Sequence, residues 1–350
     1  MVLIPGLLKS GSVADAPLFS RLISLAERIP SVAGAAGSEN SQLPVVSNVD
    51  SRHCGLESLV MHSVFKHTHD SCAARFTYQQ DFPDATENPV VLRADPAYQQ
   101  IDMNNATLSD PALLDLNIEQ AQALVSTLND FFKEDGLRFE QTDPQRWYCH
   151  FDVYPDVQTL TPGVAVDRDV SDCRPTGADA VTWRKHLAEI EMLLFEHPVN
   201  SHRESLGQLP VNTLWLWGEG RCDESPVPNI DLAGDNFYSR SVAEYVGLEY
   251  LSIDQLNADH ALVCTIDALE KNSVAGEASF NAALNALESS LGAHLWQNLK
   301  PDAYPIILIW CGGSGAFLVN SSVRKKFWLK AWRKPYALSA HLQNTQPAMP

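Results

Sequence analysis

The stretch HPVNSHRESLGQLPVNTLWLWGEGR, residues 197–221, gives the strongest indication of the fold. A polar turn leads through Pro210 into a short apolar run, residues 213–217, which the triplet Gly-Glu-Gly at 218–220 breaks abruptly. This pattern predicts a helix, a turn, a buried strand and a glycine loop. In doubly wound sheets, a loop at the carboxyl end of a strand offers backbone N–H groups to a ligand. The stretch therefore indicates an α/β fold with a candidate binding edge.

The same stretch allows two interpretations, which are compatible with each other. Trp215 and Trp217 are two residues apart, on one face of the predicted strand, and their large apolar area suits a core. Asn212 and Arg221 bracket the strand and can direct polar groups at a bound anion or a sugar hydroxyl. A rigid core strand is a good platform for residues at its ends.

Composition limits the class of protein. With 350 residues, of which 45% are hydrophobic, the chain can form one large α/β domain or a core with a smaller inserted domain. A net charge of −18 repels phosphate backbones, so we expect no nucleic-acid partner. The sequence has no apolar run of membrane-spanning length, and residues 2–13 do not resemble a signal peptide. We therefore expect no membrane span and a cytoplasmic location.

The seven cysteines are scattered without a C-x-x-C pair, which predicts reduced thiols and no disulfide framework. Residues 53–72 nevertheless contain six side chains that can ligate transition metals, namely His53, Cys54, His62, His67, His69 and Cys72. Their spacing matches no standard zinc site. A helix over about 56–65 would place His62 on a solvated face. We therefore expect no metal and no cofactor.

The first residues predict the opening of a doubly wound sheet. Residues 2–4 form a predicted strand, and Asp15 can cap a helix that follows it. The apolar positions of that predicted helix recur at helical spacing: Leu18, Leu22, Leu25, Ala26 and Ile29.

Residues 88–155 predict a compact strand–helix–strand unit that is inserted into the main fold. The first strand covers 90–93, and a helix starts at Asn117 with Gln120 in a capping-box position. The aromatic run at 147–151 alternates as a strand does. We interpret this unit as a cap.

The remaining predicted elements continue the α/β pattern up to residue 335, and residues 336–350 are expected to form a flexible tail. The predicted elements after residue 155 are a long connection at 156–179, a helix at 180–196, a helix at 239–246, and strands at 261–266 and 305–310. Between these two strands lies a predicted helix with Phe280, Leu284, Leu287, Leu291 and Leu295 on one stripe.

Two features near the end of the chain allow alternative interpretations. Gly312 and Gly313 follow an apolar strand directly, so their N–H groups can cradle phosphate, or they can form a tight reversal before residues 316–319. The basic, aromatic segment 324–334 can contact a protein partner or an anionic surface, or it can pack its aromatic face while its lysines reach water.

Four stretches in one order resemble the archaeal-type, cofactor-independent phosphoglycerate mutases. They are VLRADP at 91–96, LNIEQAQALVSTLNDFF at 116–132, TDPQRWYCHF at 142–151, and HPVN with LPVNTLWLWGEG in the central stretch. The chain is also similar to a small bacterial branch of phosphoglycerate mutase-like proteins, the RpfE-type regulatory branch. The resemblance implies an alkaline-phosphatase-like α/β core, residues 1–87 and 156–335, interrupted by an inserted α+β cap at 88–155.

The resemblance also implies a site with two divalent metal ions and a serine nucleophile, but this sequence departs from that pattern. The first strand ends in Pro5-Gly6, where the family has Asp-Gly. The strand ending at Ile266 continues as Asp267-Ala268-Leu269, without the accompanying histidine, and Cys-Gly-Gly follows Trp310 in place of Asp-His. Without metal ions a serine is a poor nucleophile at neutral pH, so we expect no metal-dependent mutase activity.

Two hypotheses of different class follow. In the first, a catalytically degenerate member keeps a cleft for a small phosphorylated or carboxylate ligand and acts as a regulator. Its expected ligand-binding residues are Arg93, Asn212, Arg221, Gly312 and Gly313. In the second, an active mutase or phosphatase draws metal ligands from His53, His62, His67 or His69. A third option is a structural protein that uses the basic segment 324–334 as its contact surface.

Overall fold

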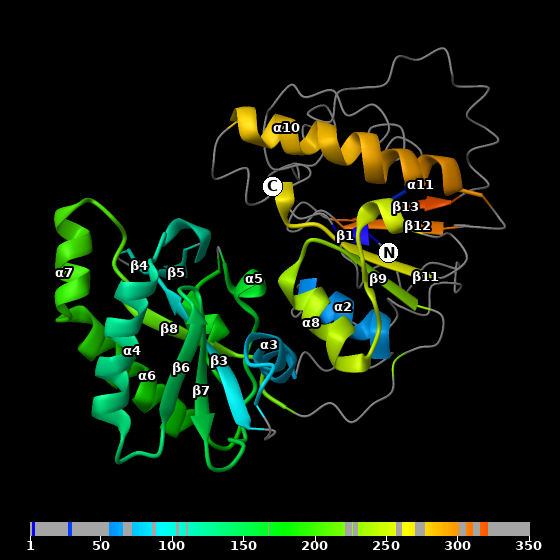
Figure 1. Cartoon of the computed structure of the whole chain (residues 1–350). Coiled ribbons are helices and arrows are strands. Elements are labelled where there is room, and N and C mark those ends of the chain that lie inside the picture. Colours follow the sequence, from blue (N-terminus) through cyan, green and yellow to red (C-terminus); the bar gives the residue numbers. More distant parts are fainter. Residues whose placement is uncertain are drawn as a thin grey trace, which may run out of the picture. The chain divides into compact units, whose positions relative to one another are not determined.

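The chain divides into two compact units in a computed structural model (Figure 1). One unit comprises Met1–Thr68 and Ser225–Pro350, and the other comprises His69–Glu224. The structure describes residues 2–3, 27–29, 56–65, 72–85, 89–102, 105–109, 111–166, 168–220, 226, 230–256, 261–269, 277–300, 306–310 and 316–320.

The first unit is built on a seven-stranded sheet with the order β10-β9-β11-β1-β12-β13-β2. Strands β10, β9, β11, β1 and β12 run parallel, whereas β13 and β2 add an antiparallel edge. The bounds are β1 Val2–Leu3, β2 Glu27–Ile29, β9 Ile230–Gly234, β10 Tyr250–Leu251, β11 Ala261–Thr265, β12 Ile306–Trp310 and β13 Ala316–Asn320. Strands β11, β12 and β13 together contain only two polar residues, Thr265 and Asn320, as is common in strands covered on both faces.

Helices lie on both sides of this sheet, with α10 and α11 on one side and α2 and α8 on the other (Figure 1). The bounds are α2 Leu56–Phe65, α8 Phe237–Val246, the short helix η5 Ile253–Gln255, α10 Glu277–Leu287, a π-helical turn η6 Glu288–Gly292 and α11 Ala293–Asn298. The predicted apolar stripe is confirmed, because Phe280, Leu284, Leu287, Leu291 and Leu295 are all buried. The doubly wound pattern therefore holds for this unit.

One prediction for the first unit is wrong. Ile29 was expected to end a helix, but residues 27–29 form β2, which pairs antiparallel with β13. Pairing at the end of the sheet satisfies the backbone groups that a helix would otherwise satisfy internally. Strands β12 and β13 pair antiparallel, and Trp310 is opposite Ala316. This pairing agrees with the prediction that the chain reverses before residues 316–319.

The second unit is built on a four-stranded antiparallel sheet with the order β6-β7-β3-β8, beside a two-stranded ribbon of β4 and β5. The bounds are β3 Val90–Ala97, β4 Gln99–Ile101, β5 Ala106–Leu108, β6 Arg138–Asp143, β7 Arg146–Phe151 and β8 Thr213–Trp217. All five residues of β8 are buried, so the predicted buried strand is confirmed.

Helices α4 and α6 pack on one face of this sheet, and α3 packs on the other (Figure 1). The bounds are α3 Ala73–Asp81, η3 Pro111–Leu113, α4 Ile118–Phe132, α5 Pro162–Ala165, η4 Val170–Cys173, α6 Ala180–Phe195 and α7 Pro198–Ser205. The predicted capping box of α4 is confirmed, because Asn117 and Gln120 bond each other's backbone N–H groups.

The observed division differs from the predicted boundary at residues 155 and 156. Strand β8 pairs antiparallel with β3, and α6 packs against this sheet, so residues 156–224 share one compact unit with 88–155. The central stretch therefore lies in an antiparallel sheet, and the expectation that it ends a strand of the doubly wound sheet is wrong. Antiparallel pairing with β3 aligns Arg93 with Trp217 and Ala97 with Thr213.

Candidate functional site

The first half of the central stretch forms α7, which is held by buried polar side chains. His197 caps the helix, since its Nδ1 accepts a hydrogen bond from the Val199 N–H at 3.1 Å. Asn200 is 2% exposed, and its Nδ2 donates to the carbonyl oxygens of Leu194 and Val211 at 2.7 and 2.6 Å. These contacts join α6, α7 and the segment that enters β8.

Arg203 completes this arrangement from the next turn of α7. Its side chain is fully buried and donates to the backbone carbonyl oxygens of Leu209 and Leu114 and, at 2.7 Å, to Gln120 Oε1. Buried carbonyl groups need such donors, because water cannot reach them. Asn200 and Arg203 thus fix the backbone of this unit.

The two tryptophans of β8 are buried, as predicted, and both indole N–H groups have partners. Trp215 Nε1 donates to the Leu160 carbonyl oxygen at 2.7 Å, and Trp217 Nε1 donates to Asp95 Oδ2 at 2.7 Å. Each side chain therefore supplies core area and a hydrogen bond that locks a neighbouring segment.

The glycine loop after β8 meets the start of α3. The Glu219 carbonyl oxygen accepts from the Cys72 N–H at 2.6 Å, and the Gly218 carbonyl oxygen accepts from the Ala74 N–H at 3.0 Å. These N–H groups belong to the first turn of α3, which has no partners for them within the helix. The carbonyl groups of the loop, and not its N–H groups, therefore make these contacts.

Gly218 is required at this position for two reasons. Its φ is +79°, and a Cβ atom there would lie 2.8 Å from the Ala74 nitrogen. The carboxylate of the next residue, Glu219, accepts from both the backbone N–H and the hydroxyl of Thr159. The loop is thus fixed from two sides.

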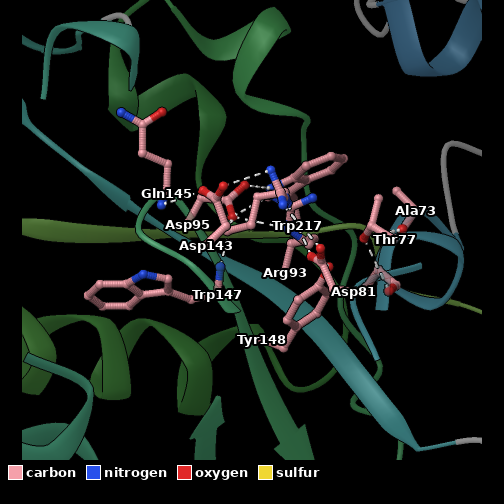
Figure 2. A network of polar contacts seen from close by, with 12 residues as sticks. Ala73, Thr77, Asp81, Arg93, Asp95, Asp143, Gln145, Trp147, Tyr148 and Trp217 are labelled. Carbon is pink, nitrogen blue, oxygen red and sulfur yellow. Dashed lines mark hydrogen bonds and ion pairs between the residues drawn. The ribbon is translucent and has the colours of Figure 1, made fainter. Parts of the chain in front are cut away.

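Arg93 forms a buried ion pair with Asp95 inside the second unit, on strand β3 (Figure 2). Arg93 Nη2 lies 2.7 Å from Asp95 Oδ1, and the two residues are 5% and 7% exposed. The guanidinium also lies over the rings of Trp217 and Tyr148, at 5.1 and 5.5 Å from their centroids. Cation–π contacts of this kind gain strength where water is excluded.

Four donors surround the Asp95 carboxylate. Besides two groups of Arg93, these are Trp217 Nε1 and the Trp147 backbone N–H, which lies 3.4 Å from Oδ1 (Figure 2). Burial raises the pKa of Asp95, and the charge of Arg93 opposes that rise. For Arg93, burial acts to lower the pKa, but the carboxylate raises it overall. The pair therefore stabilises Arg93 in its charged form.

The network continues through Tyr148 to Asp81 at the end of α3. The Tyr148 hydroxyl donates to Asp81 Oδ2 at 2.6 Å (Figure 2). Arg146 donates to both Asp81 oxygens at 3.1 Å. Burial raises the pKa of Tyr148. These contacts attach α3 to β7.

Of the five expected ligand-binding residues, Arg93 and Asn212 are described. Arg93 is engaged by Asp95, and the Asn212 side chain pairs with the backbone of Gln99: Oδ1 accepts at 2.7 Å and Nδ2 donates at 2.8 Å. Arg221, Gly312 and Gly313 lie outside the described residues, as do Pro5-Gly6 and the basic segment 324–334.

A second cluster of polar side chains, Asp235, Asn236 and Asp267, lies in the first unit, where the parallel strands β9 and β11 end. Asn236 Nδ2 donates to both oxygens of Asp267 at 2.9 Å, and Asp235 Oδ1 accepts from the Asp267 backbone N–H at 2.6 Å. Asn236 Oδ1 also caps α8 by accepting from the Ser239 N–H at 2.9 Å. Asp267 was expected from the sequence, but Asp235 and Asn236 were not, although they directly follow Gly234 at the end of β9.

In the part of the chain that the structure describes, no three His, Cys, Asp or Glu side chains come together as a metal site. No helix of that part is long and apolar enough to cross a bilayer. Most of the expected ligands at 53–72 lie outside that part, and Cys72 is buried. Among the other described cysteines, Cys149, Cys173 and Cys264 are buried free thiols.

Sequence comparison relates the chain to archaeal enzymes. It is 37% identical over 71 residues to the 2,3-bisphosphoglycerate-independent phosphoglycerate mutase of Methanothrix thermoacetophila, covering 20% of this chain and 18% of that enzyme. It is 25% identical over 125 residues to the enzyme of the same name from Methanosarcina acetivorans, covering 34% and 31%. The predicted resemblance to this family is thus confirmed, although the match spans less than a third of either relative.

The chain has low similarity to two solved structures. The cofactor-independent phosphoglycerate mutase from Thermoplasma acidophilum DSM 1728 is 13% identical, with a TM-score of 0.31, over 91% of this chain and 87% of that one. The PH0037 protein from Pyrococcus horikoshii is 12% identical, with a TM-score of 0.38, over 91% and 86%. No model of a known protein family matches the chain. The alkaline-phosphatase-like core and the RpfE-type branch stay predictions.

Proposed function

We propose that this phosphoglycerate mutase-like chain binds a small phosphorylated or carboxylate ligand and regulates another process, without metal-dependent mutase activity. Its similarity to the archaeal mutases supports a phosphoglycerate-related ligand. The absence of a carboxylate at Pro5-Gly6 and of Asp-His after Trp310 supports the loss of the metal site. The chain spans only part of its relatives, so their activity is not assigned to it.

One observation carries the proposal furthest. Asp267 is the carboxylate that remains where the family resemblance implies metal ligands, and both of its oxygens accept from the Asn236 amide. An amide N–H group is a hydrogen-bond donor and cannot ligate a cation. The neighbouring carboxylate, Asp235, accepts from the backbone of Asp267. These residues thus form a network among themselves, which suits a protein that needs no metal at this edge.

The ligand-binding residues divide into two groups in this proposal. Arg221, Gly312 and Gly313 stay the proposed ligand contacts, because arginine pairs bidentately with phosphate or carboxylate, and glycine N–H groups can approach phosphate closely. Arg93 and Asn212 have partners within the protein, so we assign them a supporting role in which they hold the second unit in shape.

The first test measures metal content by elemental analysis together with thermal melting, with and without manganese. We expect no stoichiometric metal and no manganese-dependent rise in Tm, because a ligand that binds only the native state would stabilise it. Stoichiometric zinc or manganese with a raised Tm, together with mutase turnover of 3-phosphoglycerate, would establish the active-enzyme alternative.

The second test measures ligand binding by calorimetry with 3-phosphoglycerate and inorganic phosphate on the full chain. We expect saturable binding of 3-phosphoglycerate that Arg221→Ala weakens by about tenfold or more, the loss of one charge-assisted pair. The matched control is Lys133→Ala, an exposed cation at the end of α4. Equal effects of both substitutions, or no binding at all, would contradict the proposal.

A further inference from the structure

A cavity of about 310 Å³ lies along the outer side of β8, within the second unit. Its walls come from β8, from α6 and from the segment that contains η4, and its volume is in the range of small-molecule sites, roughly 300–1,000 Å³. Strand β8 is the last strand of its sheet, so the cavity follows the edge where no further strand is paired among the described residues. Arg93 and Asn212, the two expected ligand-binding residues that the structure describes, do not line it.

Both signs of charge line this cavity. Arg184, Leu187, Ala188 and Glu191 occupy one face of α6, because they are spaced by three or four residues. Arg174 follows η4 and adds a second cation. The face thus carries a cation near one end and a carboxylate near the other.

The carboxylate of Glu191 is held in place against β8. Thr213 is 4% exposed, and its hydroxyl donates to Glu191 Oε1 at 3.1 Å. Burial raises the pKa of Glu191, while the Thr213 hydrogen bond and the charge of Arg174 oppose that rise. Arg174 and Glu191 line the same cavity, so a ligand between them would meet both charges.

The charges and the apolar walls of the cavity restrict the chemical class of ligand that it can bind. A simple anion would meet two arginines but would be repelled by Glu191, and a simple cation would be repelled by the arginines. A zwitterion satisfies both, since its carboxylate pairs with arginine and its ammonium group with Glu191. The remaining lining offers apolar contact to a hydrocarbon group through Val170, Leu187, Leu214 and Leu216.

We propose that this cavity binds an α-amino acid with an aliphatic side chain. The carboxylate of the amino acid lies against Arg174 and Arg184, its ammonium group against Glu191, and its side chain against the leucines of α6 and β8. The proposal gives the chain a second small ligand in addition to phosphoglycerate.

Calorimetric titration of the full chain with alanine, valine and leucine tests this assignment. Two analogues of leucine carry one charge each: 4-methylpentanoate keeps the carboxylate, and 3-methylbutylamine keeps the ammonium group. We expect saturable binding of at least one of the amino acids, about tenfold or more tighter than that of either analogue or of inorganic phosphate. Failure of all three amino acids, or equal binding of an analogue, would overturn the proposal.

Two substitutions locate the site. Glu191→Gln keeps the size of the side chain and its bond to Thr213 but removes the charge, and Arg174→Ala removes one cation. Each is expected to weaken amino-acid binding by about tenfold or more and to leave 3-phosphoglycerate binding unchanged. Their controls are Glu196→Gln and Lys185→Ala, exposed charges on or next to α6 that do not line the cavity. Unchanged binding in Glu191→Gln, with native melting behaviour, would place the amino acid elsewhere and refute the assignment.

Discussion

Charged side chains occupy different places in the two sheets. In the antiparallel sheet of the second unit, Arg93 and Asp95 lie in the interior, 5% and 7% exposed. In the first unit, Asp235 and Asp267 follow parallel strands, and Asp235 is exposed. Both arrangements satisfy the carboxylates, but only the buried one needs an opposite charge to compensate for lost water. The buried Arg93–Asp95 pair therefore has a structural role, whereas the carboxylate of Asp235 in the first unit is exposed to water.

Removing one partner of the buried pair is expected to have the largest effect. Asp95→Ala leaves the Arg93 guanidinium buried without its carboxylate, so we expect the free energy of unfolding to fall by about 3–5 kcal/mol. Urea denaturation measures this change. The control Asp130→Ala alters an exposed carboxylate and should change it by less than about 0.5 kcal/mol. If Asp95→Ala lowers the free energy of unfolding by less than about 1 kcal/mol, the buried carboxylate has no structural role that distinguishes it from the exposed one.

The contact between the glycine loop and α3 gives the next largest effect. Gly218→Ala adds a Cβ atom 2.8 Å from the Ala74 nitrogen at a φ of +79°, so we expect a loss of about 2–3 kcal/mol. Gly207→Ala has a similar φ of +72° but nothing within 4 Å, and should cost about 1 kcal/mol. Urea denaturation measures both losses. If the two substitutions lower the free energy of unfolding equally, the close contact between Gly218 and Ala74 does not contribute to stability.

At the strand ends of the first unit, the expected effect is smaller. Asn236→Ala removes the cap of α8 and the donor to Asp267, and we expect a loss of about 1–2 kcal/mol. Asn117→Ala, which removes only the capping box of α4, is the comparison and should cost about 1 kcal/mol. Calorimetric melting of both variants measures the difference. An Asn236→Ala variant as stable as the native chain would show that the hydrogen bonds at Asp267 do not stabilise the first unit.

The smallest expected effect is a dependence on pH in the second unit. Burial, and after it the charge of Arg138, lowers the pKa of His150 from 6.5 to about 4, although Glu140 opposes this shift. Between these two pH values the unfolded chain binds more protons than the folded chain, so stability falls as the pH falls through that window.

The variant His150→Gln tests this dependence. We expect native protein to lose more stability than the variant when urea denaturation at pH 6.5 is compared with pH 4.5. The exposed control His202→Gln should behave as native protein does. Parallel loss in all three proteins would assign the acid sensitivity to other groups.

Local patterns predicted most elements of the fold correctly. The capping box at Asn117, the apolar stripe from Phe280 to Leu295 and the buried run at 213–217 depend on neighbouring residues, and all three are confirmed. Pairing of distant segments was not predicted. The sequence contains no local sign that β8 aligns with β3, and this alignment decided which sheet the central stretch joined.

The site was harder to predict for the same reason. Arg93 has a charge that suits a ligand, but its partner Asp95 is two residues away, where both side chains lie on the same face of β3. That spacing was available in the sequence and could have indicated an internal ion pair. Asn236 and Asp267 meet only because β9 and β11 are neighbours in the sheet.

The hydrogen bond between Cys72 and Glu219 bears on whether the second unit can be transferred to another protein. This bond, 2.6 Å long, joins positions close to the two ends of His69–Glu224. A segment whose ends meet can be inserted into a host loop, or removed and replaced by a short linker, without stretching the host chain. The unit thus has the geometry of a portable module, suited to exchange between proteins and to circular permutation.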